Sequence, residues 1–182
     1  MTQTQAAIDA RYLEVLPQWL RSLGEDVAAV GGAIEALGPD DEATRALVAG
    51  VNYVFKSLDL IPDGIEDLGF LDDAFVIRVS CSFAVAARPE LNEGVLAGLA
   101  ADARAVHEFL GDDYARLEAY VKGARKGAAR GRTVEEIVVH APVRQGFLDD
   151  LRAWSAAYQV PRFTRDPKTL VKLKAFLSAK LS

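Results

Sequence analysis

The chain has 182 residues, of which 51% are hydrophobic and 26% charged, with a single cysteine, Cys81. This length supports one domain, or little more, with a buried core, and the apolar fraction excludes an intrinsically disordered chain. One cysteine excludes an internal disulfide framework and any site with several cysteine ligands, such as a structural zinc or iron–sulfur centre. We expect Cys81 to be a small buried hydrophobe in a protein of a reducing compartment.

The N-terminal residues, MTQTQAAIDARYLEV, lack the basic and apolar regions of a secretory signal. The apolar stretch 74–87 is interrupted by Arg78, and it is shorter than the roughly 20 residues that a transmembrane helix needs. We therefore expect a cytoplasmic protein without a transmembrane segment, either soluble or peripheral to a membrane.

The net charge of −5 is distributed unevenly along the chain. Residues 1–121 carry 21 acidic and 8 basic side chains, whereas residues 122–182 carry 5 acidic and 13 basic ones. This polarity predicts either an anionic partner for the C-terminal third or docking of the two parts on each other. We divide the chain into an acidic helical part (1–121), a basic glycine-rich linker (122–132) and basic C-terminal helices (133–182) that we expect to pack on the first part.

Helical patterns dominate the first part of the chain. Apolar residues spaced by three and four predict a first helix, which Pro17 is expected to kink or restart. A second helical run covers 26–37 and stops at a Gly-Pro pair, after which Asp40 or Asp41 caps a third helix. The segment 59–73 is loop-like, because it contains proline and glycine turn signals.

Helical signals continue to the C-terminus. Two further helices are expected over 73–88 and 91–110, and Asp112 is expected to cap the next one. The capping box Thr133–Glu136 opens another helix, which Pro142 interrupts or restarts. Asp166 caps the last helix, which continues to the end of the chain. The sequence therefore predicts an all-α fold: a single-domain bundle of about seven or eight helices around a helical hairpin with an acidic connecting loop.

The connecting loop is the most informative stretch, with six carboxylates in the fifteen residues 59–73. They alternate with leucine, isoleucine and phenylalanine, and we expect these apolar residues to hold some of the carboxylates against the core. In one interpretation the loop is structural: Asp63 belongs to a turn, and Asp72 caps the next helix. In the other, Asp59, Asp63, Asp72 and Asp73 form an irregular Mg²⁺ or Ca²⁺ site, because hard cations require several converging oxygen atoms.

The same loop resembles the motif of the YkvA-like family, a bacterial domain of unknown function. The matching residues are Asp59, Leu60, Ile61, Pro62, Asp63, Leu68, Gly69, Asp72 and Asp73. Lys56-Ser57 stands where the family has Ser-Pro, and Glu66 replaces a second proline, which leaves the backbone less constrained. The resemblance covers about residues 45–90. It implies a helical hairpin and frequent association with membranes, and it implies no established reaction.

A basic segment follows the sixth predicted helix and contains Lys122, Arg125, Lys126, Arg130 and Arg132. Glycines between these residues weaken any helix and predict a flexible or fraying segment. The segment is either a solvated linker or a contact for an anionic partner. A membrane surface is the favoured partner over nucleic acid, because the run lacks interleaved aromatic residues and a nucleic-acid fold signature.

Catalytic signatures are absent from the sequence. His107 and His140 lack the spacing of a metalloprotease motif, and there is no nucleophile elbow or dinucleotide-binding glycine motif. We therefore predict a non-enzymatic interaction or regulatory module whose partner is a protein or an anionic membrane surface. Two alternatives stay open: a divalent-metal-dependent enzyme or metal-binding protein that uses the four aspartates, and a nucleic-acid-binding protein that uses the C-terminal third.

Overall fold

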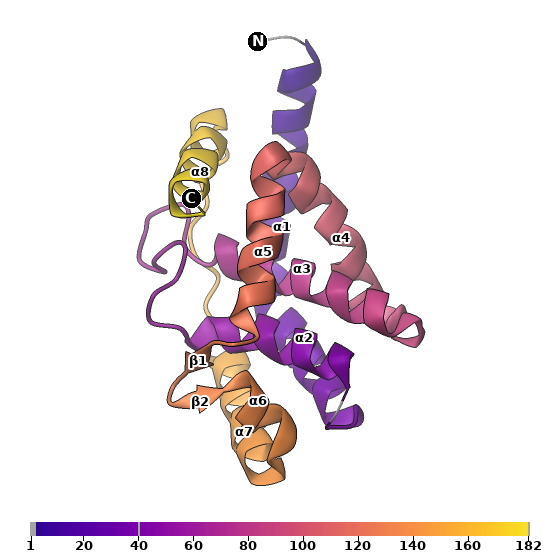
Figure 1. Cartoon of the computed structure of the whole chain (residues 1–182). Helices are drawn as coiled ribbons and strands as arrows, with labels where there is room; N and C mark the ends of the chain where they lie inside the picture. Colours follow the sequence, from indigo (N-terminus) through magenta and orange to yellow (C-terminus); the bar gives the residue numbers. More distant parts are fainter. Residues whose placement is uncertain (1–2, 40, 182) are drawn as a thin grey trace.

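The computed structural model describes residues 3–39 and 41–181, and it is almost entirely helical (Figure 1). The helices are α1 (Gln3–Ala36), α2 (Glu42–Asn52), α3 (Leu71–Ala87), α4 (Gly94–Leu110), α5 (Tyr114–Ala124), α6 (Val134–Val139), α7 (Ala141–Ala157) and α8 (Pro167–Lys180). Short 3₁₀ turns span Tyr53–Phe55, Pro89–Leu91 and Gly111–Asp113, and a two-stranded antiparallel hairpin joins β1 (Ala128–Ala129) to β2 (Arg132–Thr133). The predicted all-α multi-helix bundle is confirmed.

Helix α1 is continuous over 34 residues, so the predicted division into two helices was wrong. Pro17 lies inside the helix and removes one backbone hydrogen bond. The buried face nevertheless continues on both sides of the proline, with Leu16 and Leu20 around it and Ile34 near the helix end. Packing of this long apolar face against the other helices outweighs the local loss.

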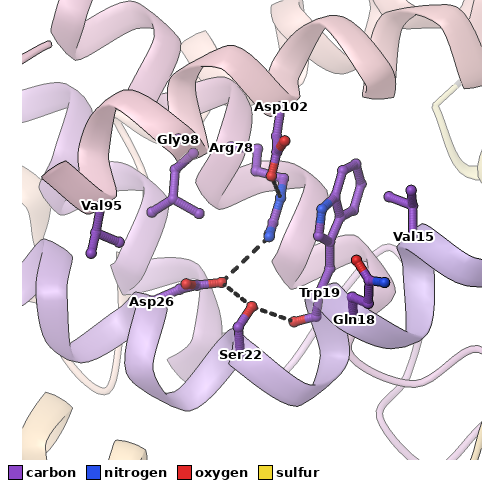
Figure 2. A pocket seen from close by; sticks show the side chains of 10 residues that line it. Val15, Gln18, Trp19, Ser22, Asp26, Arg78, Val95, Gly98 and Asp102 are labelled. Carbon is purple, nitrogen blue, oxygen red and sulfur yellow. Dashed lines mark hydrogen bonds and ion pairs between the residues drawn. The ribbon is translucent and has the colours of Figure 1, made fainter. Parts of the chain in front are cut away.

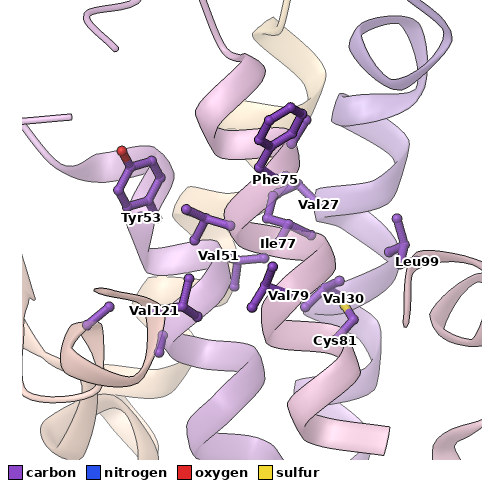
Figure 3. Packing of buried hydrophobic residues seen from close by; sticks show 14 of the residues in the cluster. Val27, Val30, Val51, Tyr53, Phe75, Ile77, Val79, Cys81, Leu99 and Val121 are labelled. Carbon is purple, nitrogen blue, oxygen red and sulfur yellow. The ribbon is translucent and has the colours of Figure 1, made fainter. Parts of the chain in front are cut away.

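Helices α2 and α3 form an antiparallel pair with close backbone approach. A β-carbon at Gly50 of α2 would lie 2.5 Å from the β-carbon of Ser80 in α3, so glycine permits this contact. Helix α3 is the central element, and α1, α2, α4 and α5 all pack against it. Figure 3 shows this core, in which Ile77, Val79 and Cys81 of α3 meet Val27, Val30, Val51, Leu99 and Val121.

Cys81 is fully buried, as expected from the sequence. Burial raises the pKa of its thiol to about 12, so the thiolate form is scarce at neutral pH. This cysteine therefore acts as a small hydrophobe in the core.

The helix starts agree with the sequence prediction in part. Asp41 caps α2 by accepting a hydrogen bond from the backbone of Ala43, and Asp40 lies outside the described residues. Asp72 does not cap α3, because the tight loop brings Phe70 into the N-cap position and Asp72 into the first turn. Asp112 does not cap α5 either, because it belongs to the 3₁₀ turn before that helix.

The later helices begin close to their predicted signals. Thr133 and Glu136 form the predicted capping box of α6, and Asp166 caps α8 by accepting from the backbone of Lys168. Helix α4 begins at Gly94 rather than at 91, because the residues before it form a 3₁₀ turn. Pro142 occupies the first turn of α7, where its missing N–H is tolerated.

The C-terminal helices pack on the N-terminal ones: α7 and α8 contact α1, and α6 contacts α2. Ser155 Oγ donates a hydrogen bond to the carbonyl of Gly24 (2.5 Å), and Tyr158 Oη donates one to the carbonyl of Leu20 (2.7 Å). Among the described helices, none combines the length and the apolar character that crossing a membrane requires.

Candidate functional site: a buried carboxylate cluster

The loop between α2 and α3 is held on the core by a tight turn and apolar anchors. The backbone N–H of Ile65 donates to the carbonyl of Pro62 (2.9 Å), and that of Gly69 donates to the carbonyl of Ile65 (3.0 Å). A β-carbon at Gly69 would overlap the carbonyl oxygen of Asp63, so only glycine fits there. Leu60, Ile61 and Leu68 are buried, which confirms that apolar residues fix this loop.

Asp72 is 0% exposed and links the loop to α3. Its Oδ2 accepts hydrogen bonds from Tyr53 Oη (2.6 Å) and from the backbone of Ile61 (2.9 Å). Tyr53 Oη in turn accepts a hydrogen bond from the backbone of Leu60 (2.7 Å). Burial raises the pKa of Asp72 to about 6, although the bonds from Tyr53 and Ile61 favour its charged form.

Asp73 is 2% exposed, and its Oδ2 has no hydrogen-bond partner in the described part of the chain. Burial, followed by the negative charges of Asp72, Asp63 and Asp59, raises the pKa of Asp73 well above its ordinary value. Negative charges within this group of four aspartates raise the pKa values of three of them, and we call Asp59, Asp63, Asp72 and Asp73 the carboxylate cluster.

Asp59 and Asp63 contribute to the cluster from the loop. Burial, then the charges of Asp72 and Asp63, raises the pKa of Asp59 to about 7, and Lys56 partly opposes this rise. Burial alone raises the pKa of Asp63. The charge of Asp63, an exposed side chain at the edge of the cluster, contributes to the raised pKa of each of the other three carboxylates.

Three tyrosines surround the cluster and were not predicted from the sequence. Tyr53 precedes the loop, Tyr120 lies in α5, and Tyr158 follows α7. Burial and the neighbouring carboxylates raise the pKa of each hydroxyl, so all three remain protonated. They come from segments up to about a hundred residues apart, and no local pattern marks them as neighbours of the cluster.

Two further loop carboxylates are engaged by the C-terminal part of the chain. Glu66 forms an exposed ion pair with Arg162 (3.3 Å). Asp67 Oδ1 accepts hydrogen bonds from the backbone (2.9 Å) and the hydroxyl (2.8 Å) of Thr164. Figure 1 shows the loop at the left of the molecule between α8 and the β-hairpin. The C-terminal segment thus contacts the loop through Glu66 and Asp67, whereas Arg162 and Arg165 pair with Glu66 and Glu14 rather than with the four clustered aspartates.

A complete all-protein metal site is not formed by these side chains. Within residues 3–39 and 41–181, no group of three or more His, Cys, Asp or Glu side chains is arranged to hold a metal ion. The cluster does contain buried carboxylate oxygen atoms without a hydrogen-bond partner in the described residues, on Asp59, Asp72 and Asp73. Such atoms are costly to bury, by about 1–3 kcal/mol each.

The five predicted basic residues have different surroundings. Arg125 forms an ion pair with Glu42, and Arg132 forms one with Asp150 (2.6 Å). Arg130 lies over the ring of Phe55, with its guanidinium carbon 4.3 Å from the ring centroid. The remaining two side chains, of Lys122 and Lys126, are exposed.

The structure contains a second buried polar centre, shown in Figure 2. Arg78 is 2% exposed. Its Nε donates a hydrogen bond to Asp102 (3.2 Å), and its Nη2 donates one to Asp26 (3.4 Å). Its guanidinium carbon lies 4.2 Å from the ring centroid of Trp19. Its Nη1 donates to the carbonyl of Ala74 (3.1 Å). An open hollow of about 400 Å³ lies beside it. Since all three guanidinium nitrogens are engaged, this arginine centre is neutralised within the fold.

The geometry defines an all-α module built around a helical hairpin with a buried acidic loop. Residues 44–78 match the DUF1232 family, which is described as a protein of unknown function. DUF1232 is the domain of unknown function that is also called the YkvA-like family. This match confirms the resemblance that the loop motif indicates, over a segment shorter than the predicted 45–90, and it contains all four clustered aspartates. No curated protein and no solved structure matches the chain.

Proposed function

We propose that this protein is a non-enzymatic interaction module that docks reversibly on an anionic membrane surface. The proposal is carried by one observation: Leu58 is 87% exposed, although it is a large apolar residue, and it follows Lys56 by two residues in the chain. We call Lys56, Leu58, Lys126 and Arg130 the hairpin patch.

The residues of the hairpin patch come from two segments that contact each other. The Lys56 Cε atom lies 3.8 Å from the β-carbon position of Gly127, which is next to Lys126 in the chain. Arg130 stacks on Phe55, one residue before Lys56. The turn of the β-hairpin, at Arg130 and Gly131, has positive φ angles of 50° and 73°, as a tight two-residue hairpin turn requires, and Lys126 and Arg130 are both exposed.

The expected affinity is low. A basic residue near an anionic bilayer contributes about 1 kcal/mol, and a leucine that becomes fully buried contributes about 1.5–3 kcal/mol. The Lys56 ammonium lies over the rings of Tyr53 and Tyr120, so Lys126, Arg130 and Leu58 supply most of the binding. Their combined contribution does not exceed that of a single fatty-acyl anchor, which is weak and reversible. Such a low affinity suits a module that associates with a membrane and dissociates again.

The test is co-sedimentation of the full chain with vesicles of phosphatidylcholine alone and of phosphatidylcholine with phosphatidylserine. We expect binding to the anionic vesicles that decreases as salt increases, because exposed charges are screened. The double variant Lys126→Glu and Arg130→Glu should abolish binding to the anionic vesicles, and Leu58→Ser should weaken this binding.

The matched control is Arg104→Glu, which reverses one exposed charge on α4, away from the hairpin patch. This variant should bind as the parent does. Equal binding to both kinds of vesicle, or none at low salt, would contradict the proposal. Tighter, steeply salt-dependent binding to nucleic acid would instead assign the basic segment to a nucleic-acid partner.

A further inference from the structure

Asp72 and Asp73 of the carboxylate cluster are buried, Asp59 is partly buried and Asp63 is exposed at its edge, and no ion pair within residues 3–39 and 41–181 neutralises the two buried carboxylates. Asp59, Asp72 and Asp73 each have one buried carboxylate oxygen without a hydrogen-bond partner among residues 3–39 and 41–181. Asp72 and Asp73 lie on α3, whereas Asp59 and Asp63 come from the loop, so the two sides of the cluster belong to different elements. Like charges in this arrangement separate the loop from the helix unless a cation or protons neutralise them.

Local structure does not explain the cluster. Phe70, not an aspartate, occupies the N-cap position of α3. A carboxylate in the first turn of a helix gains typically 0.3–1 kcal/mol from the helix dipole, whereas each unpartnered buried oxygen costs about 1–3 kcal/mol. The unpartnered oxygen of Asp73 is on a side chain that is 2% exposed and that the negative charges of the other three carboxylates influence. This oxygen is therefore the observation that points to a ligand.

The chemistry of the donors selects a hard cation. The donors are carboxylate oxygens, without the histidine and cysteine ligands that zinc prefers. No three side chains in the described part of the chain converge as an all-protein cage, which disfavours Ca²⁺ with its six to eight oxygen ligands. Mg²⁺ retains several water molecules and binds through one or two carboxylates, so it does not require such a cage.

We propose that the carboxylate cluster binds one hydrated Mg²⁺ ion, with Asp73 and one further aspartate as direct ligands and the other carboxylates bound through water. The ion bridges the loop and α3, because ligands from both elements surround it. It is a structural and regulatory ligand: it fixes the loop on the bundle, and no reaction is assigned to it.

The first experiment is thermal unfolding of the full chain at about pH 7.5, after treatment with a chelator. MgCl₂ is then added at matched ionic strength, with NaCl as the comparison. At about a hundred times the dissociation constant, Mg²⁺ should raise the melting temperature by about 5–10 °C. Ca²⁺ should give a smaller rise at equal concentration.

The second experiment is electron paramagnetic resonance with Mn²⁺, which replaces Mg²⁺ in oxygen sites and allows bound ions to be counted. We expect one bound ion per chain, displaced by Mg²⁺. The variant Asp73→Asn should lose both the bound Mn²⁺ and the thermal response. It retains the shape of the side chain and removes repulsion, so it is expected to fold.

The matched control is Asp112→Asn, which removes a carboxylate from the exposed turn before α5. This variant should keep the full response to Mg²⁺, and an equal loss would show that the ions bind nonspecifically to the acidic surface. If the parent chain shows no bound Mn²⁺ and no Mg²⁺ response, and acidification alone stabilises it, the proposal is overturned and protons neutralise the cluster.

Discussion

Two buried polar centres lie on the same helix, and they are opposite in their charge balance. At the first turn of α3, Asp72 and Asp73 face other carboxylates and have unpartnered oxygen atoms. Further along, Arg78 donates to Asp26 and to Asp102, and its guanidinium is fully engaged. Asp72, Asp73 and Arg78 are each at most 2% exposed, so the burial of these side chains does not distinguish the two centres.

The difference in charge balance indicates which of the two polar centres is structural. The arginine centre obtains its counter-charges from α1 and α4, and it thereby joins three helices. The carboxylate cluster obtains no comparable counter-charge within the described residues, because Lys56 is half-buried at its edge and opposes only part of the rise in the pKa of Asp59. A centre that the fold neutralises serves the fold, whereas a centre without an internal counter-charge takes up protons or a cation from solution.

The largest expected effect comes from removing the cation of the arginine centre. Arg78→Met leaves the Asp26 carboxylate buried without its partner, so we expect a loss of about 3–5 kcal/mol in the free energy of unfolding. Urea unfolding would measure this loss. Adding Asp26→Asn and Asp102→Asn to Arg78→Met should recover much of it, and a loss below about 1 kcal/mol in the single variant would contradict the structural role.

The next effect is a dependence of stability on pH in the metal-free protein. The pKa values of Asp59 (about 7) and Asp72 (about 6) lie above the ordinary value of 3.8. The folded chain therefore holds protons that the unfolded chain has released, so this stability is present at low pH and is lost as the pH rises through these values. Because Asp59 is partly exposed and screened, we expect a loss on the order of 3 kcal/mol between about pH 5 and pH 8.

The measurement is urea unfolding across this pH range in the presence of a chelator and at constant ionic strength. The double variant Asp59→Asn and Asp72→Asn should make the profile flatter, because it removes the groups that titrate. Arg78→Met retains the carboxylate cluster and should keep the slope. A profile in which the parent gains stability as pH rises from about 5 to 8 would contradict the assignment of raised pKa values.

A smaller effect is expected at the tyrosine that connects the loop to Asp72. Tyr53→Phe removes the hydroxyl that donates to Asp72 Oδ2 and accepts from the backbone of Leu60. Leaving these buried groups without a partner should lower the free energy of unfolding by about 1–3 kcal/mol. The control Tyr114→Phe alters a tyrosine remote from the cluster, which stacks on His107, and should have a lesser effect.

The sequence predicted the helical class and the acidic loop because both depend on local patterns. Apolar spacing identifies helices, and Asp41, Thr133 and Asp166 are local start signals that the structure confirms. The loop motif likewise identified the family segment. The expected division into a first helix and a second one over 26–37 was wrong, because long-range packing of α1 outweighs the local signals.

The sequence could not predict which charges the fold would neutralise. Arg78 and Asp26 are 52 residues apart, and Tyr158 reaches the cluster from the far end of the chain. Partners of this kind depend on how helices dock, and no periodicity within one helix encodes them. The aspartates that attract attention in the sequence are therefore recognisable as a group, whereas their unpartnered state becomes visible only in three dimensions.

The comparison is sharpest when the same substitution is made in both centres. Asp73→Asn removes a charge that its neighbours repel, so in chelator at neutral pH it should raise the free energy of unfolding by about 1–2 kcal/mol. Burial raises the pKa of Asp26 although Arg78 opposes this rise, but Asp26→Asn leaves the buried Arg78 without one of its two carboxylate partners, so it should lower the free energy of unfolding by a similar amount. Urea unfolding of the two variants side by side would measure both signs. Added Mg²⁺ should reverse the first result, because the parent gains a ligand that Asp73→Asn cannot hold, and it should leave the second unchanged. If both substitutions destabilise the metal-free protein equally, the two centres do not differ in charge balance, and the carboxylate cluster needs no external cation.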